Sequence, residues 1–229
     1  MKKKILVFAI TATLALSLAA CNKGGEENSQ ATFIEPVNQT SEQIEVVTSE
    51  TIETSEVAVE VEEGPVRADG ERFETTIMLE GMEETVQYEH IKNDAIGYEM
   101  DYDYESFKKE SEGLRDRIVS VYDNEPENYM LIMYWEESPE DAVKGITEEL
   151  SGIYDVEVQD YTLENAGACK RIPAEVLKGT DNMADELQMV YVIPAGNGSI
   201  VVRDYYTIEA AEGFGHRFKY MLNTLKVIK

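Results

Sequence analysis

Residues 186–208 read ELQMVYVIPAGNGSIVVRDYYTI, and this stretch decides the fold. Two runs rich in β-branched and aromatic residues, 186–193 and 199–208, flank a short segment of Pro, Ala, Gly and Asn. Such runs bounded by turn residues are typical of β-strands, and a short connection makes the two strands antiparallel. We therefore predict a β-hairpin here. Because strand side chains alternate, Tyr205 and Tyr206 are expected on opposite faces.

The same signals recur along residues 69–229, which we expect to form a single domain with one good core. Further strands are predicted at residues 73–80, 84–91, 96–102, 117–122, 129–135, 156–163 and 169–177. Helices are predicted at 104–112, from Ser138-Pro139-Glu140-Asp141 onward, and at 210–225, where an apolar stripe keeps helical spacing. Sequential strands with tight turns indicate an antiparallel sheet, which amphipathic helices must cover. The predicted fold class is α+β, an antiparallel sheet with helices on both faces.

The first twenty residues have the parts of a secretory signal. Three lysines precede an apolar run over 5–18, which is shorter than the roughly 20 residues that a membrane-spanning helix needs. The run ends in Leu18-Ala19-Ala20-Cys21, which resembles the lipobox of bacterial lipoproteins. That resemblance implies cleavage of 1–20 and a diacylglyceryl anchor on Cys21, on the extracytoplasmic face of the cell membrane. The competing interpretation is a transmembrane anchor.

Residues 21–68 differ in composition from the rest of the chain. They are rich in Glu, Ser and Thr and hold a single aromatic residue, Phe33. High charge with few large apolar residues favours a disordered linker. As a flexible coil its 47 residues after Cys21 would span about 40 Å. The sequence thus predicts a lipidated cysteine, an acidic linker and a domain held off the membrane.

Three motifs in the domain support a second resemblance. Residues 77–86 (IMLEGMEETV), 97–103 (GYEMDYD) and 212–215 (EGFG) are similar to bacterial envelope lipoprotein domains of the PsbP-like α-β-α sandwich type. The resemblance covers about 70–229 and implies non-enzymatic binding or assembly roles. A fold alone does not fix a function.

Charge is the strongest compositional feature. The formal net charge is −26, and removal of the signal with its three lysines leaves −29. Phosphate contacts need Lys and Arg, so a general nucleic-acid binder is excluded. Partners chosen by charge would be a cationic envelope protein or polymer, or divalent metals. A plain solubility role of the acidic surface is the competing interpretation.

Few residues could support catalysis. His90 and His216 are the only histidines, no Gly-x-Ser-x-Gly elbow accompanies them, and both are expected to be partly exposed structural residues. Cys169 is expected to be a small buried hydrophobe. No Walker loop, dinucleotide fingerprint or zinc cluster is present, so no cofactor and no enzymatic activity are predicted.

A metal site is the sharpest alternative. Asp101, Asp103, Glu105 and Glu112 occupy positions 1, 3, 5 and 12 of a calcium loop, but Ser106 stands where the EF-hand turn needs Gly. We therefore predict a non-catalytic binding or accessory module of the cell envelope. A lipoprotein that binds a metal or small ligand is the second hypothesis, and a hydrolase is the third.

Overall fold

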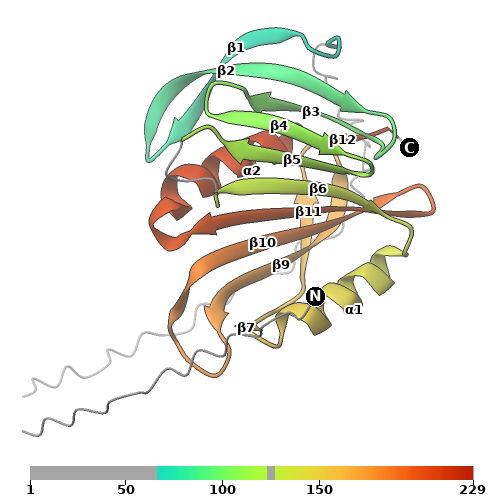
Figure 1. Ribbon diagram of the computed structural model, residues 1–229, viewed down its shortest axis with the longest axis vertical. Helices are drawn as coiled ribbons and strands as arrows, with labels where there is room; N and C mark the ends of the chain where they lie inside the picture. Colours follow the sequence, from blue (N-terminus) through green and yellow to red (C-terminus); the bar gives the residue numbers. More distant parts are fainter. Residues whose placement is uncertain (1–65, 123–126, 229) are drawn as a thin grey trace, which may run out of the picture. The chain divides into compact units, whose positions relative to one another are not determined.

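The computed structural model describes residues 66–122 and 127–228; the predicted signal, Cys21 and the linker up to residue 65 lie outside them. Two antiparallel sheets dominate this part of the chain (Figure 1). The larger sheet has the order β4-β5-β6-β11-β10-β9-β7, with β8 also paired to β9. Its strands are β4 (Phe107–Glu112), β5 (Arg115–Ser120), β6 (Tyr129–Trp135), β7 (Tyr154–Asp155), β8 (Gln159–Leu163), β9 (Gly167–Leu177), β10 (Met183–Ala195) and β11 (Gly198–Thr207).

The smaller sheet has the order β1-β2-β3-β12. Its strands are β1 (Arg72–Leu79), β2 (Met82–Asn93), β3 (Tyr98–Asp103) and β12 (Lys226–Val227). The turn between β1 and β2 uses Glu80 and Gly81, with φ values of 51° and 79°. A two-residue hairpin turn of this kind needs positive φ at both positions, which Gly adopts without steric cost. The antiparallel α+β prediction therefore holds, with two sheets in place of one.

Helices are few. Helix α1 (Pro139–Leu150) begins as predicted, because the Ser138 hydroxyl accepts from the Asp141 backbone N–H. It packs on β9, β10 and β11, and buries Ala142, Ile146 and Leu150. Helix α2 (His216–Asn223) packs on β3 and β1. Within the described residues, every helix is too short or too polar to cross a membrane.

Two helix predictions are corrected. Residues 104–112 are not a helix, because Phe107–Glu112 form β4 and pair with β5. Only Phe107 of this strand is buried, so its sequence carries no clear alternation. The predicted helix over 210–225 is divided into a 3₁₀ turn, η1 (Ile208–Ala210), a π-turn, η2 (Ala211–Gly215), and α2. The chain then ends in the edge strand β12.

Polar contacts join several of these elements. Arg203 of β11 donates to both carboxylate oxygens of Glu149 in α1, at 2.8 and 2.7 Å. Asp116 of β5 is fully buried and accepts from Tyr98 of β3 at 2.6 Å.

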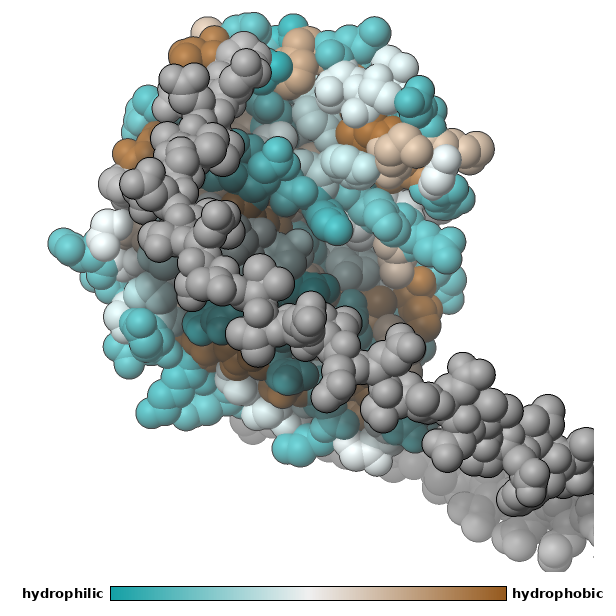
Figure 2. Space-filling model, turned by 180° about the vertical axis from the view of Figure 1, so that it is seen from behind, coloured by the Kyte–Doolittle hydropathy of each residue, from teal (hydrophilic) through white to brown (hydrophobic). Residues whose placement is uncertain are grey.

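An aromatic cluster packs α2 against β4 and β11, and it comprises Phe107, Tyr206, Phe214 and Phe218. Outside the grey atoms, hydrophilic residues cover much of the face shown in Figure 2.

Candidate functional site

The four carboxylates of the predicted calcium loop do not converge. Asp101 lies against His90, and Asp103 lies 2.7 Å from a guanidinium nitrogen of Arg217. Glu105 is exposed, and Glu112 forms an ion pair with Arg115. No group of three or more His, Cys, Asp or Glu residues suited to a metal ion occurs within residues 66–122 and 127–228. The predicted lipidation site Cys21 lies outside those ranges.

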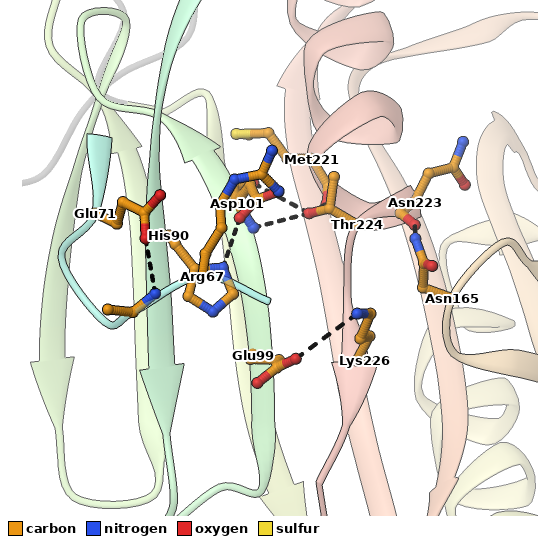
Figure 3. Close-up of polar contacts among 11 residues, drawn as sticks. Arg67, Glu71, His90, Glu99, Asp101, Asn165, Met221, Asn223, Thr224 and Lys226 are labelled. Atoms are coloured by element: carbon orange, nitrogen blue, oxygen red, sulfur yellow. Dashed lines mark hydrogen bonds and ion pairs between the residues drawn. The ribbon is translucent and has the colours of Figure 1, made fainter. Parts of the chain in front are cut away.

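His90 and Asp101 form the first candidate site (Figure 3). The register of β2 and β3 places them directly opposite each other, and His90 Nδ1 lies 2.6 Å from Asp101 Oδ1. Arg67 approaches the second carboxylate oxygen at 3.5 Å. A hollow of about 220 Å³ adjoins this group and is lined by Val66, Arg67, His90, Glu99, Asp101, Asn165, Thr224 and Lys226. His90 is thus buried, not partly exposed as predicted.

A paired His and Asp are also the base and orienting group of a hydrolase triad. Among the described residues lining this hollow, Thr224 carries the only hydroxyl. That hydroxyl donates to the Met221 carbonyl at 2.7 Å and accepts from the Asp101 N–H at 2.8 Å. The first bond lies within the end of α2 and the second ties that end to β3, so this hydroxyl is engaged in structural hydrogen bonds.

The second candidate site is an aromatic–arginine face, which we define by Arg117, Tyr129, Leu131 and Tyr205. The rings of Tyr129 and Tyr205 stack at 4.5 Å, and the Arg117 guanidinium lies 4.0 Å from the Tyr129 centroid. All four side chains are half-buried. A hollow of about 630 Å³ adjoins the face and is lined by Glu110, Ser111, Glu112, Arg115, Arg117, Tyr129 and Leu131.

The pairing of the strands explains why this face is open. Arg203 pairs with Leu131, and Tyr205 pairs with Tyr129, so these side chains share one side of the sheet. Arg203 reaches Glu149, so this is the side on which α1 packs. The main contacts of α1 are with β9, β10 and β11, whereas the neighbouring part on β5 and β6 stays partly accessible. Tyr206 contacts Phe218 on the opposite side, as the alternation predicts.

Cys169 and His216 serve neither candidate site. Cys169 is buried, as predicted, and burial raises the pKa of its thiol to about 11. A thiol of this kind is a poor nucleophile near neutral pH. His216 is exposed, and its Nδ1 lies 2.6 Å from the carbonyl oxygen of Glu212 in the preceding turn.

The class of the fold is α+β, with mostly antiparallel sheets and few helices. No family model matches the chain, and no curated protein matches it either. Among solved structures, it is similar to the solution structure of cyanobacterial PsbP (CyanoP) from Synechocystis sp. PCC 6803. The TM-score is 0.44 and the sequence identity 14%, over 61% of this chain and 92% of that one. A likeness at this level does not indicate a function.

Proposed function

We propose that the protein is a lipid-anchored extracytoplasmic module that binds another component of the cell envelope and catalyses no reaction. The anchor is a diacylglyceryl group on Cys21, and residues 22–68 carry the domain away from the membrane. The N-terminal lysines, the short apolar run and the lipobox support the anchor. A Cys21→Ser variant should stay unprocessed and leave the membrane fraction, and unchanged processing and fractionation would contradict the anchor.

The aromatic–arginine face carries the binding proposal. Tyr, Trp and Arg are the residues most enriched at the centres of protein interfaces, because they bury large areas and keep a polar end. Here a stacked pair of tyrosines lies under an arginine on one open part of a sheet. The long-range field of a chain with net charge −26 would draw a cationic protein or polymer toward it.

A photocrosslinking experiment in intact envelopes tests this proposal. Benzoyl-phenylalanine is placed at Leu131 on the face, and in a separate matched variant at Met82, which is 68% exposed at the β1–β2 turn. We expect a discrete adduct from position 131 and none from position 82. Adding Tyr129→Ala and Tyr205→Ala should weaken the adduct at least tenfold, since hot-spot side chains contribute about 2 kcal/mol or more. Equal adducts at both positions, or none at position 131, would contradict it.

We also propose that the finer architecture is a PsbP-like α-β-α sandwich with helices on both faces of the larger sheet. Two positions of β11, three residues apart, support this arrangement. Arg203 contacts Glu149 of α1, whereas Tyr206 contacts Phe218 of α2. Residues three apart on a strand point to opposite faces. An experimental structure with both helices on one face would refute it.

A further inference from the structure

Asp204 is an acidic residue buried in the larger sheet. It lies in the middle of β11 between Met189 of β10 and Met130 of β6, and it is 3% exposed. Its Oδ1 atom is fully buried and has no hydrogen-bond partner within the described residues. A buried polar group without a hydrogen bond destabilises a fold and calls for an explanation. A hydrophobic residue at this position would pack better, so the acid points to a role other than stability.

The carboxyl lines a hollow on the side of the sheet opposite the aromatic–arginine face. The hollow measures about 210 Å³, and its lining includes Arg171, Glu175, Tyr191, Tyr206 and Lys219. The π-turn η2 contributes Ala211 and Gly215 to the wall. Short π-helical segments within helices are frequent at functional sites. Its volume equals that of about seven water molecules, enough for one small ring.

Arg171 of this hollow donates to Met189 Sδ at 3.0 Å and to Gln159 Oε1 at 3.3 Å, but other polar groups of the lining are available to a ligand. Within residues 66–122 and 127–228, neither the Tyr191 nor the Tyr206 hydroxyl forms a hydrogen bond with another side chain or backbone group. Lys219 likewise forms no ion pair in that part of the chain. Burial raises the pKa of Asp204 well above its usual value, and the oxygens of a carboxyl group accept hydrogen bonds from hydroxyl groups. The hydroxyl groups of Tyr191 and Tyr206 can both donate and accept hydrogen bonds.

These groups select the chemistry of the ligand. The two basic side chains at the hollow, Arg171 and Lys219, are matched by the two acidic ones, Glu175 and Asp204, so the lining favours neither a cation nor an anion as ligand. Hydroxyl groups both donate and accept hydrogen bonds, so they can pair with the buried carboxyl group and with the two phenols. Tyrosine rings also offer apolar surface beside each hydroxyl.

We propose that the hollow at Asp204 binds one neutral polyhydroxylated ring, that is, a single sugar unit. The acid and the two tyrosine hydroxyls hold the ring hydroxyls, and Lys219 closes the rim. The ring is either a free monosaccharide or the terminal residue of a glycan. The site shares no side chain with the aromatic–arginine face, so each proposal stands or falls alone.

Isothermal calorimetry on the full chain in detergent micelles tests the site. The probes are glucose, galactose and N-acetylglucosamine, with sodium acetate and methylammonium chloride as charged comparisons. We expect at least one sugar to bind with a millimolar Kd and neither charged probe to bind. Asp204→Leu and Tyr206→Phe should each weaken sugar binding about tenfold or more. Tyr104→Phe, which removes a hydroxyl that is not part of this lining, should leave sugar binding unchanged.

Thermal unfolding separates a binding role from a structural one. Asp204→Leu replaces an unpartnered acid by an apolar side chain, so its melting temperature should equal or exceed that of the parent while sugar binding is lost. Should Asp204→Leu fail to fold, the loss of sugar binding in Tyr206→Phe still tests the proposal. A trisaccharide that ends in the bound sugar distinguishes the sources: equal or tighter binding indicates a glycan end, and exclusion indicates a free sugar. Absence of sugar binding at 100 mM, or binding of a charged probe alone, would overturn the proposal.

Discussion

The contact between the two sheets offers a sharp test of the structure. Asp116 of β5 is fully buried, and its Oδ2 accepts from the Tyr98 hydroxyl at 2.6 Å and from Asn93 at 2.9 Å. The Lys109 ammonium lies 3.5 Å away. Burial alone would raise the pKa of Asp116, but hydrogen bonds, that of Tyr98 foremost, outweigh it and hold the pKa below its usual value. Tyr98→Phe removes that hydroxyl and keeps the buried ring.

The expected loss follows from the charge of the acceptor. A hydrogen bond to a charged group contributes about 1.5–3 kcal/mol, more than one between neutral groups. We therefore expect Tyr98→Phe to lower the free energy of unfolding by about 2 kcal/mol. For a domain of this size that loss corresponds to a fall of about 4–8 °C in melting temperature. Tyr104→Phe, at a half-buried turn position, should change the free energy by less than about 0.5 kcal/mol.

Urea unfolding at several pH values is the assay. A folded-state pKa below the ordinary 3.8 gives a stability contribution that is complete above that value and is lost as pH falls through the folded-state pKa. The difference between parent and Tyr98→Phe should therefore be full at pH 7 and shrink below about pH 4. In the Asp116→Asn background, Tyr98→Phe should lower the free energy of unfolding by less than half of the loss seen in the parent. A loss equal to that of Tyr104→Phe, or one independent of pH, would refute the reasoning.

Three further predictions follow from local geometry. A Cβ atom on Gly198 would lie 2.3 Å from a backbone oxygen of β6, so Gly198→Ala should lower the free energy of unfolding by about 2–3 kcal/mol. A Cβ atom on Gly145 in α1 would meet open space, so Gly145→Ala should raise the free energy of unfolding slightly; urea unfolding measures both. Hydrogen bonds from Arg203 lower the pKa of Glu149. Glu149→Gln should therefore lower the free energy of unfolding by about 1–2 kcal/mol, a value that allows for the half-exposed carboxylate. The difference in unfolding free energy between parent and variant, measured in urea, should shrink below about pH 4. Alkylation of Cys169 by iodoacetamide at pH 8 should be about 100-fold slower in the folded chain than in urea, and equal rates measured by mass spectrometry would show the thiol to be accessible.

The long hairpin could be predicted because local signals and burial agree there. Strands β10 and β11 overlap the predicted runs 186–193 and 199–208, with β10 extending beyond its run at both ends, and β6 spans Tyr129–Trp135 as predicted. Strand β4 could not be found, because Phe107 is its only buried residue and the Lys and Glu residues that follow are typical of exposed edge strands as well as of helices. Strand β12 has only two residues, too few for any periodicity.

The candidate sites depend on register and packing, which local patterns do not specify. His90 faces Asp101 only because β2 and β3 pair in one particular register. Strand β6 reads YMLIMYW, so every position is apolar or aromatic and the sequence does not reveal which face is open. The hollow at Asp204 has walls from β9, β10, β11, η2 and α2, which follow one another along the chain, and only strand pairing and helix packing bring their side chains together. The one usable signal was an acid in the middle of an apolar strand.

Strand β11 connects the two proposed sites and makes them separable. Tyr205 belongs to the aromatic–arginine face, and Tyr206, the next residue, lines the hollow at Asp204. Because consecutive strand residues point to opposite faces, each site can be altered from this strand without touching the other. Tyr205→Ala should therefore reduce crosslinking from position 131 and leave sugar binding intact. Tyr206→Phe should weaken sugar binding and leave crosslinking from position 131 unchanged. If both variants impaired both activities equally, a single damaged sheet would explain the losses better than two sites.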